Sequence, residues 1–350
     1  MTRRRRLIAA VSASVALTLG VVLTLTLTGN AAPVRPVAVR LVTPHLTPPR
    51  PKPRRSPTRL LSPFTGEPVR KLGPVLVAKI DNIVYARPQT GLMSADIVYV
   101  LPVEGGLSRF EAVFSSHIPA VIGPVRSARE DDLELLRQFG RPAFAFSGAT
   151  PHLLPFVERA RIVDLYAGLP AVAGAYQRNA SRVAPYNLYA SSSALLADAR
   201  GASVARDIGF RFGPVPAAAA GTGVAPAGYP AGYSAASFTF RWSARAGKWM
   251  VSMDRAPASV ILPSGKTAQL AAPTIVIQHT VIRTSRFLEY GKPPPYAQTL
   301  GSGTAVVLRG GKAYTVHWSR PSADAGTAYT LPGGQRMTFA PGQVWVLLVA

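Results

Sequence analysis

Short apolar runs separated by polar or glycine-rich breaks fill the chain from residue 63 to residue 212. Segments 75–80, 95–103, 107–114 and 144–147 are apolar with few interruptions, which is typical of strands buried on both faces. Glu104-Gly105-Gly106 stands between the second and third of these segments and predicts a tight hairpin. Segments 155–160 and 191–199 have helical character. Strands and helices therefore intermix, and we predict a mixed α/β domain over 63–212.

The pattern changes beyond residue 232 to short runs rich in β-branched and aromatic residues. Glycine-containing turns at 265–266 and 310–312 separate several of them. The predicted strands are 238–242, 249–253, 274–278, 304–308, 313–318 and 344–349. Between the two patterns, residues 213–232 are rich in Ala, Gly and Pro and read as a linker. The predicted fold class is α+β, with the mixed domain followed by a mainly-β C-terminal domain over 233–350.

The first 30 residues have the pattern of a membrane-targeting segment. Four arginines at 3–6 precede an uncharged apolar stretch over 7–28, long enough to span a bilayer. We expect an uncleaved anchor, with the folded domains outside the cytoplasm at the cell membrane. Cleavage as a signal peptide, followed by secretion, is the alternative. Residues 31–62 are rich in Pro and Arg and predict an extended linker.

The distribution of charge argues against a nucleic-acid partner. The formal charge is +23, but 11 of the 39 Lys and Arg lie in the first 60 residues, where there is no Asp or Glu. The rest of the chain has no Lys/Arg-rich run. The concentrated positive charge instead suits an anionic membrane or wall surface. The chain also has no cysteine, which excludes disulfides, thiol nucleophiles and a lipid-modified cysteine anchor.

No cofactor or metal motif is present in the sequence. The five histidines are isolated from one another, and there is no phosphate-binding loop, dinucleotide fingerprint or G-x-S-x-G sequence. We therefore expect no metal and no cofactor. A catalytic triad assembled from distant residues has no sequence signal pointing to it.

Residues 123–130 predict a helix start that carries two arginines. Ser127 and Glu130 have the spacing of a capping box, Arg126 and Arg129 lie in the same stretch, and Gly140 would end the helix. Arginines near free helical N–H groups suit a carboxylate or phosphate ligand. The alternative is a plain helix start in which the arginines pair with the acids of the first turn.

A larger polar set surrounds this stretch, and strand ends are expected to bring it together at one rim of a sheet. The candidate ligand-binding residues are Asp81, Asn82, Arg87, Gln89, Asp96, Glu104, Arg109, Arg126, Ser127 and Arg129. One interpretation is an ion-pair network, because buried carboxylates need partners. The other is a polar cleft for a charged ligand, in which paired acids could also act as acid and base.

These segments resemble the YerB-like lipoprotein family, two-domain bacterial envelope proteins of unknown function. The motifs that carry the resemblance are Asp81-Asn82, residues 86–92, 95–99, 103–110 and 122–129, with weaker echoes at 187–189, 301–303 and 341–345. The resemblance implies two domains and an extracytoplasmic location. No reaction is established for the family, so the resemblance implies no activity. Three features depart from the family: the lipid-bearing cysteine is missing, Val100 replaces a glutamate, and Tyr186 replaces a histidine. The last two weaken any acid–base role at those positions.

Two functions from different classes follow. We favour a membrane-tethered extracytoplasmic protein that binds or scaffolds without catalysis, with an anionic cell-wall polymer or a cell-wall synthesis protein as partner. The alternative is an envelope hydrolase or transferase that uses Asp81, Asp96 or Glu104.

Overall fold

The computed structural model describes residues 59–220, 222–289 and 291–350. The predicted anchor or signal peptide over 1–30 and most of the linker over 31–62 lie outside these residues. Within them, no helix combines the length and the apolar character that crossing a membrane requires.

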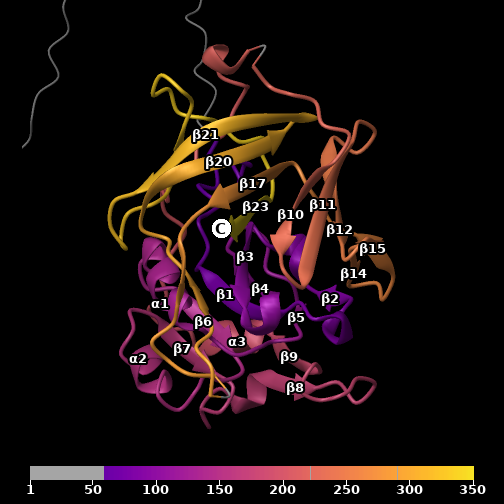
Figure 1. The fold of residues 1–350 in the computed structure, drawn as a ribbon. Helices are drawn as coiled ribbons and strands as arrows, with labels where there is room; N and C mark the ends of the chain where they lie inside the picture. The colour runs from indigo at the N-terminus through magenta and orange to yellow at the C-terminus, as the bar shows by residue number, and fades with distance from the viewer. Residues whose placement is uncertain (1–58, 221, 290) are drawn as a thin grey trace, which may run out of the picture. The chain divides into compact units, whose positions relative to one another are not determined.

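One ten-stranded sheet runs through both halves of the described chain (Figure 1). Its strands, in spatial order, are β22 (Ala328–Thr330), β21 (Lys312–Arg320), β20 (Gly301–Arg309), β17 (Thr274–His279), β23 (Val344–Val349), β3 (Ile97–Val103), β4 (Leu107–Phe114), β1 (Leu76–Asp81), β6 (Ala143–Phe146) and β7 (Val163–Tyr166). The first five strands come from the C-terminal half and the last five from the N-terminal half. The predicted fold class is confirmed, and the shared sheet joins its two parts.

The last strand of the chain, β23, connects the two halves. It pairs in parallel with β17 on one side, where Thr274 faces Val344, and with β3 on the other, where Ile97 faces Val344. All six of its residues are buried. A strand at the centre of a sheet with both faces covered requires such an unbroken apolar run, which is why its sequence does not alternate.

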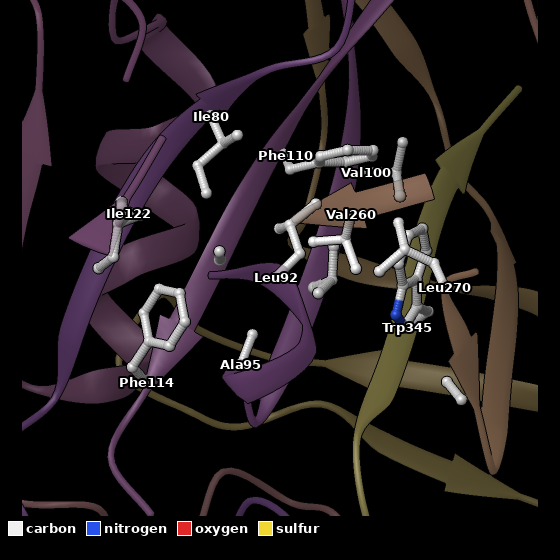
Figure 2. Close-up of a cluster of buried hydrophobic side chains, with 14 of the residues drawn as sticks. Ile80, Leu92, Ala95, Val100, Phe110, Phe114, Ile122, Val260, Leu270 and Trp345 are labelled. Carbon is white, nitrogen blue, oxygen red and sulfur yellow. The ribbon is translucent and has the colours of Figure 1, made fainter. Parts of the chain in front are cut away.

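Two hydrophobic clusters cover the opposite faces of this sheet, because successive side chains of a strand point to opposite sides. One cluster takes Ile80, Val100, Phe110 and Trp345, which Figure 2 shows packed with Leu92, Val260 and Leu270. The other takes alternate residues of the same strands, among them Val77, Tyr99 and Val346. The hydrophobic core is therefore continuous across the two halves.

Smaller elements cover the faces and edges of the main sheet. Three short α-helices are α1 (Glu130–Leu135), α2 (Leu154–Glu158) and α3 (Ser192–Asp198). A second sheet contains β10 (Tyr229–Tyr233), β11 (Ala236–Ser243), β12 (Lys248–Met253), β13 (Ala256–Pro257) and β16 (Ala271–Ala272). Two further sheets are β15 (Thr267–Gln269), β14 (Ser259–Ile261) and β2 (Gln89–Thr90), and β5 (Val121–Ile122), β9 (Leu188–Ser191) and β8 (Tyr176–Arg178). The hairpin β18 (Ile282–Thr284) and β19 (Pro295–Ala297) completes the set.

Two sequence predictions differ from the observed local structure. Strand β10 begins at Tyr229, inside the segment 213–232 predicted to be a linker, because its backbone pairs with β11. The capping box is shifted by two residues: α1 begins at Glu130, Arg129 is its N-cap, and the Arg129 N–H donates to Asp132 Oδ2 at 2.7 Å. The Ser127 carbonyl instead accepts from Arg109, which keeps Ser127 outside the helix. Gly140 follows the helical segment with φ 85°, as predicted.

Candidate functional site

Strand direction explains which of the predicted residues meet. Strands β1 and β3 both run antiparallel to β4, so they run parallel to each other. Their carboxyl ends carry Asp81 and Glu104 to one rim of the sheet, beside the beginning of β4. Arg109 of β4 lies opposite Asp81 in the register. Most of the predicted polar set therefore gathers at this rim, which we call the polar rim.

Asn82 fixes the loop that follows β1. Its amide nitrogen donates to Ser108 Oγ at 2.9 Å, and its amide oxygen accepts from Gln89 Nε2 at 3.0 Å. Arg87 folds back and donates from Nη2 to the Asn82 carbonyl at 2.7 Å, while its Nη1 pairs with Asp254 Oδ2 at 2.7 Å. These bonds hold the loop over residues 83–88 in one position. The Arg87 and Gln89 side chains thus bind other groups of the protein and stabilise this loop.

The loop over residues 123–129 is held between two strands of the main sheet. The Arg126 N–H donates to the Lys79 carbonyl at 2.8 Å, and the Ser147 N–H donates to the Arg126 carbonyl at 3.0 Å. Arg109 Nη1 donates to the Ser127 carbonyl at 3.1 Å. Burial, followed by the neighbouring charge of Arg129, lowers the pKa of Arg109 to about 10, so its guanidinium stays charged at neutral pH.

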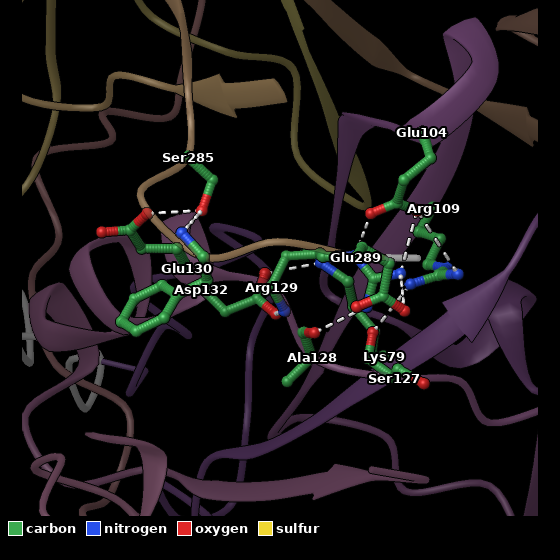
Figure 3. A network of polar contacts seen from close by, with 11 residues as sticks. Lys79, Glu104, Arg109, Ser127, Ala128, Arg129, Glu130, Asp132, Ser285 and Glu289 are labelled. Atoms are coloured by element: carbon green, nitrogen blue, oxygen red, sulfur yellow. Dashed lines mark hydrogen bonds and ion pairs between the residues drawn. The ribbon is translucent and has the colours of Figure 1, made fainter. Parts of the chain in front are cut away.

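Arg129 is the most completely paired arginine of the polar rim (Figure 3). Its Nε and Nη2 donate to the two Glu104 oxygens at 2.6 and 2.9 Å, and Nη2 also lies 3.2 Å from Glu289 Oε1. Its side chain is only 4% exposed. Burial alone would raise the pKa of Glu104, but the hydrogen bonds and charge of Arg129, together with the charge of Arg109, outweigh it and lower that pKa. Arg129 therefore joins the hairpin after β3 to the start of α1 and the segment before β19.

Arg126 differs from the other arginines of the polar rim. Its Nε lies 2.9 Å from Asp81 Oδ2, and its guanidinium carbon lies 5.5 Å from the centre of the Tyr186 ring. Its two terminal amino groups make no hydrogen bond or ion pair with any described residue, and its side chain is 20% exposed. Arg126 therefore combines a fixed position with unused donors that a ligand can reach.

Asp96 does not join the polar rim, and this part of the prediction is wrong. It precedes β3, so it lies at the opposite end of that strand from Glu104. There its Oδ2 accepts from the Ser116 N–H at 2.8 Å, and it lines a separate cavity of about 210 Å³ with Glu67 and His117. Burial raises the pKa of Asp96 to about 6. Both ends of an apolar strand look alike in sequence, and only the direction of the strand separates them.

Sequence reasoning missed a fully buried charged cluster next to the polar rim. Lys79 Nζ lies 2.5 Å from Asp132 Oδ1 and 2.8 Å from Glu111 Oε1, and all three side chains are 0% exposed. Burial, followed by the charge of Asp132, raises the pKa of Glu111 well above its ordinary value and that of neighbouring Asp131 to about 7. The available signal was a charged residue inside each of two apolar strands, Lys79 in β1 and Glu111 in β4.

Four cavities lie among the described residues, and one of them, of about 610 Å³, reaches the polar rim at Glu104. The four cavities found range from about 210 to 710 Å³, and none of these four is lined by Asp81, Arg109 or Arg126. The 710 Å³ groove lies between the ends of β8 and β14 and is lined by Tyr189, Ile261 and Arg178 without any carboxylate. None of these four cavities is lined by an arginine of the predicted polar set, so none of them matches the predicted polar cleft. The polar rim is a network of paired charges in which Glu104 and Arg126 are partly exposed, and only Arg126 has terminal amino groups without a partner among the described residues.

Family profiles match both halves of the chain. The profile described as the N-terminal domain of a protein of unknown function, DUF3048, matches residues 64–205, and its C-terminal domain matches residues 229–346. The chain belongs to the DUF3048 family. The predicted likeness to the YerB-like family is also confirmed: the Bacillus subtilis (strain 168) protein named "Putative lipoprotein YerB" is 36% identical over 137 residues.

That alignment covers 38% of this DUF3048 chain and 40% of the relative, so the chain matches about two fifths of the relative's length. The crystal structure of YerB from Bacillus subtilis has the same fold, with a TM-score of 0.67 and 21% identity. The structural alignment covers 83% of this chain and 97% of the YerB chain. At this identity the structural likeness establishes the DUF3048 fold and nothing about its chemistry.

Proposed function

We propose that this chain is an extracytoplasmic protein, tethered to the membrane by its N-terminal segment, that binds an anionic cell-wall ligand without catalysis. The apolar stretch over 7–28 behind four arginines supports the tether. The word lipoprotein in the name of the relative is consistent with an envelope location. The ligand is either the wall polymer itself or an anionic part of a wall-synthesis protein.

The unused donors of Arg126 carry this proposal. A guanidinium has five N–H donors in a planar fork that matches a carboxylate or a phosphate. Asp81 forms an ion pair on the Nε side, Tyr186 lies beside the guanidinium, and the terminal amino groups remain free among the described residues. Because Asp81 is buried and Arg126 is partly exposed, the site is pre-formed and its open side faces outward.

The state of the three candidate carboxylates favours binding over hydrolysis or group transfer. Asp81 pairs with Arg126, Glu104 is held by both oxygens to Arg129, and Asp96 lies at the other end of β3. General acid–base catalysis by two carboxylates needs both to face one substrate position. The geometry of these residues does not supply that arrangement.

Cosedimentation with purified cell-wall sacculi tests the proposal, using the full chain in detergent micelles. Arg126→Gln alone would leave buried Asp81 without its charged partner, so the test variant is the double change Asp81→Asn with Arg126→Gln. Loss of a charge-assisted fork is expected to weaken binding about tenfold or more. Thermal unfolding checks that the variant remains folded.

Arg245→Gln is the control for loss of an arginine elsewhere on the surface. Arg245 is exposed in the turn between β11 and β12, and this change lowers the net charge by one, whereas the double variant leaves the net charge unchanged. We expect the control to bind sacculi like the unmodified chain. Equal binding by the double variant and the control would overturn the proposal.

A further inference from the structure

Two exposed loops place a pair of tyrosines beside Arg126. Tyr85 lies in the loop after β1 and is 70% exposed, and Tyr186 lies in the loop between β8 and β9. Their ring centres are 5.7 Å apart, with 30° between the ring planes. Val84 and Val183, on the same two loops, are 62% and 77% exposed. Large exposed aromatic and apolar groups gathered on one surface usually mark a binding site.

The tyrosine pair is held in place by the fold. Arg182 donates from Nη1 to the Ala86 carbonyl at 3.0 Å and from Nη2 to the Pro88 carbonyl at 2.8 Å, which ties one loop to the other. Buried Asn187 donates to the carbonyls of Asn179 and Arg182, which fixes the second loop from within. Ordering the rings before binding reduces the entropy lost when a ligand packs on them.

We propose that Tyr85 and Tyr186 form a stacking surface for a sugar ring whose acidic group is bound by Arg126. This inference rests on the proposed function and names the ligand class for the same site, an acidic sugar. One face of a pyranose ring presents C–H groups, which pack on the electron-rich face of an aromatic ring. Its acidic substituent would then accept hydrogen bonds from the free amino groups of Arg126.

Another arginine–aromatic contact among the described residues, at Arg286, lacks one of these features. Arg286 lies 5.2 Å from the centre of the Phe156 ring, and Phe156 is 42% exposed. However, Arg286 Nε pairs with Glu130 Oε1 at 2.6 Å, and that carboxylate opposes an anionic ligand. Phe156→Ala is therefore a matched control for loss of an exposed aromatic ring beside an arginine.

The experiment is a ligand titration monitored by NMR, with the full chain in detergent micelles. The acidic sugars are N-acetylmuramic acid, which carries a carboxylate, and glucose 1-phosphate, which carries a phosphate. Lactate and inorganic phosphate supply the acid alone, and N-acetylglucosamine and glucose supply the ring alone. At least one acidic sugar is expected to bind about fivefold more tightly than its acid-only and ring-only partners. Comparing the two acidic sugars distinguishes a carboxylate-bearing from a phosphate-bearing wall component.

Variants separate the ring contact from the charge contact. Tyr85→Ala should weaken acidic-sugar binding about fivefold, Tyr85→Phe should retain it, and Phe156→Ala should leave it unchanged. If Tyr85→Ala has no effect while the Arg126 double variant still loses binding, the sugar inference fails and the anion-binding function stands. If the acid-only ligands bind as tightly as the acidic sugars, the sugar inference likewise fails. If the Arg126 double variant binds sacculi normally, both fail.

Discussion

Replacement of Arg129 by Ala should destabilise the protein far more than replacement of an exposed arginine that also forms an ion pair. Arg129 is 4% exposed and serves Glu104 and Glu289, whose side chains are 28% and 12% exposed. Removing one partner of a buried pair costs about 3–5 kcal/mol, because the remaining charge stays desolvated. Glu104 keeps some contact with water, so we expect about 3 kcal/mol for Arg129→Ala.

Arg137→Ala is the comparison, since Arg137 Nη2 lies 2.7 Å from Asp324 Oδ2 while the two side chains are 47% and 45% exposed. An exposed pair of this kind contributes about 0–1 kcal/mol. Urea denaturation followed by circular dichroism measures both changes in unfolding free energy. A loss for Arg129→Ala no greater than that for Arg137→Ala would show that the polar rim does not hold the fold together.

The same pair has a defined pH dependence. Because the pKa of Glu104 is lowered in the folded state, its pairing stabilises the protein above the ordinary carboxyl value of 4.5 and is lost as the pH falls through the lower folded value. The destabilisation caused by Arg129→Ala should therefore shrink in acid. A destabilisation that stays constant down to pH 2 would contradict the assignment of this pair.

Two further predictions concern the buried cluster and the hairpin after β3. The pKa of Asp131 is raised to about 7, so its stabilising contribution is present below its ordinary value of 3.8 and is lost as the pH rises to 7. Asp131→Asn should therefore make the unfolding free energy decline less steeply with pH over that range. An unchanged slope would exclude Asp131 as the source of the decline. At the hairpin, a Cβ on Gly106 would lie 1.9 Å from Ser234 Oγ, whereas one on Gly105 meets nothing within 4 Å, and both glycines have φ 70°. Gly105→Ala should therefore cost about 1 kcal/mol, the left-handed backbone penalty alone, and Gly106→Ala should cost more in the same urea assay unless Ser234 moves aside.

The paired charges of the polar rim and the unpaired amino groups of Arg126 have different positions in the proposed site. Paired charges fix the loops over 83–88 and 123–129, and those loops in turn hold Tyr85 and Arg126 at the surface. Most of the predicted ligand-binding residues therefore support the proposed site rather than contact a ligand. Of the two alternatives that the sequence left open, the ion-pair network is observed, and binding of a charged ligand at Arg126 stays a proposal.

The amino-acid sequence by itself determined the local elements and the fold class. Apolar runs at 95–103, 107–114 and 344–349 correspond to β3, β4 and β23, since burial on both faces requires nearly unbroken apolar sequence. The glycines at 105–106 and 310–311 mark observed turns with positive φ, which a residue without Cβ adopts at little cost. The motifs around Asp81 and Arg126 were likewise sufficient to indicate the family.

Only the tertiary structure decided which polar groups meet and which remain available. The direction of β3 sent Asp96 and Glu104 to opposite rims, and strand pairing and helix packing brought Lys79, Glu111 and Asp132 together across 53 residues of sequence. The contact between Tyr186 and Arg126 joins two loops that no periodicity connects. Local patterns record burial and turn preference one segment at a time, whereas the pairing of charges depends on strand order and register, which long-range packing sets.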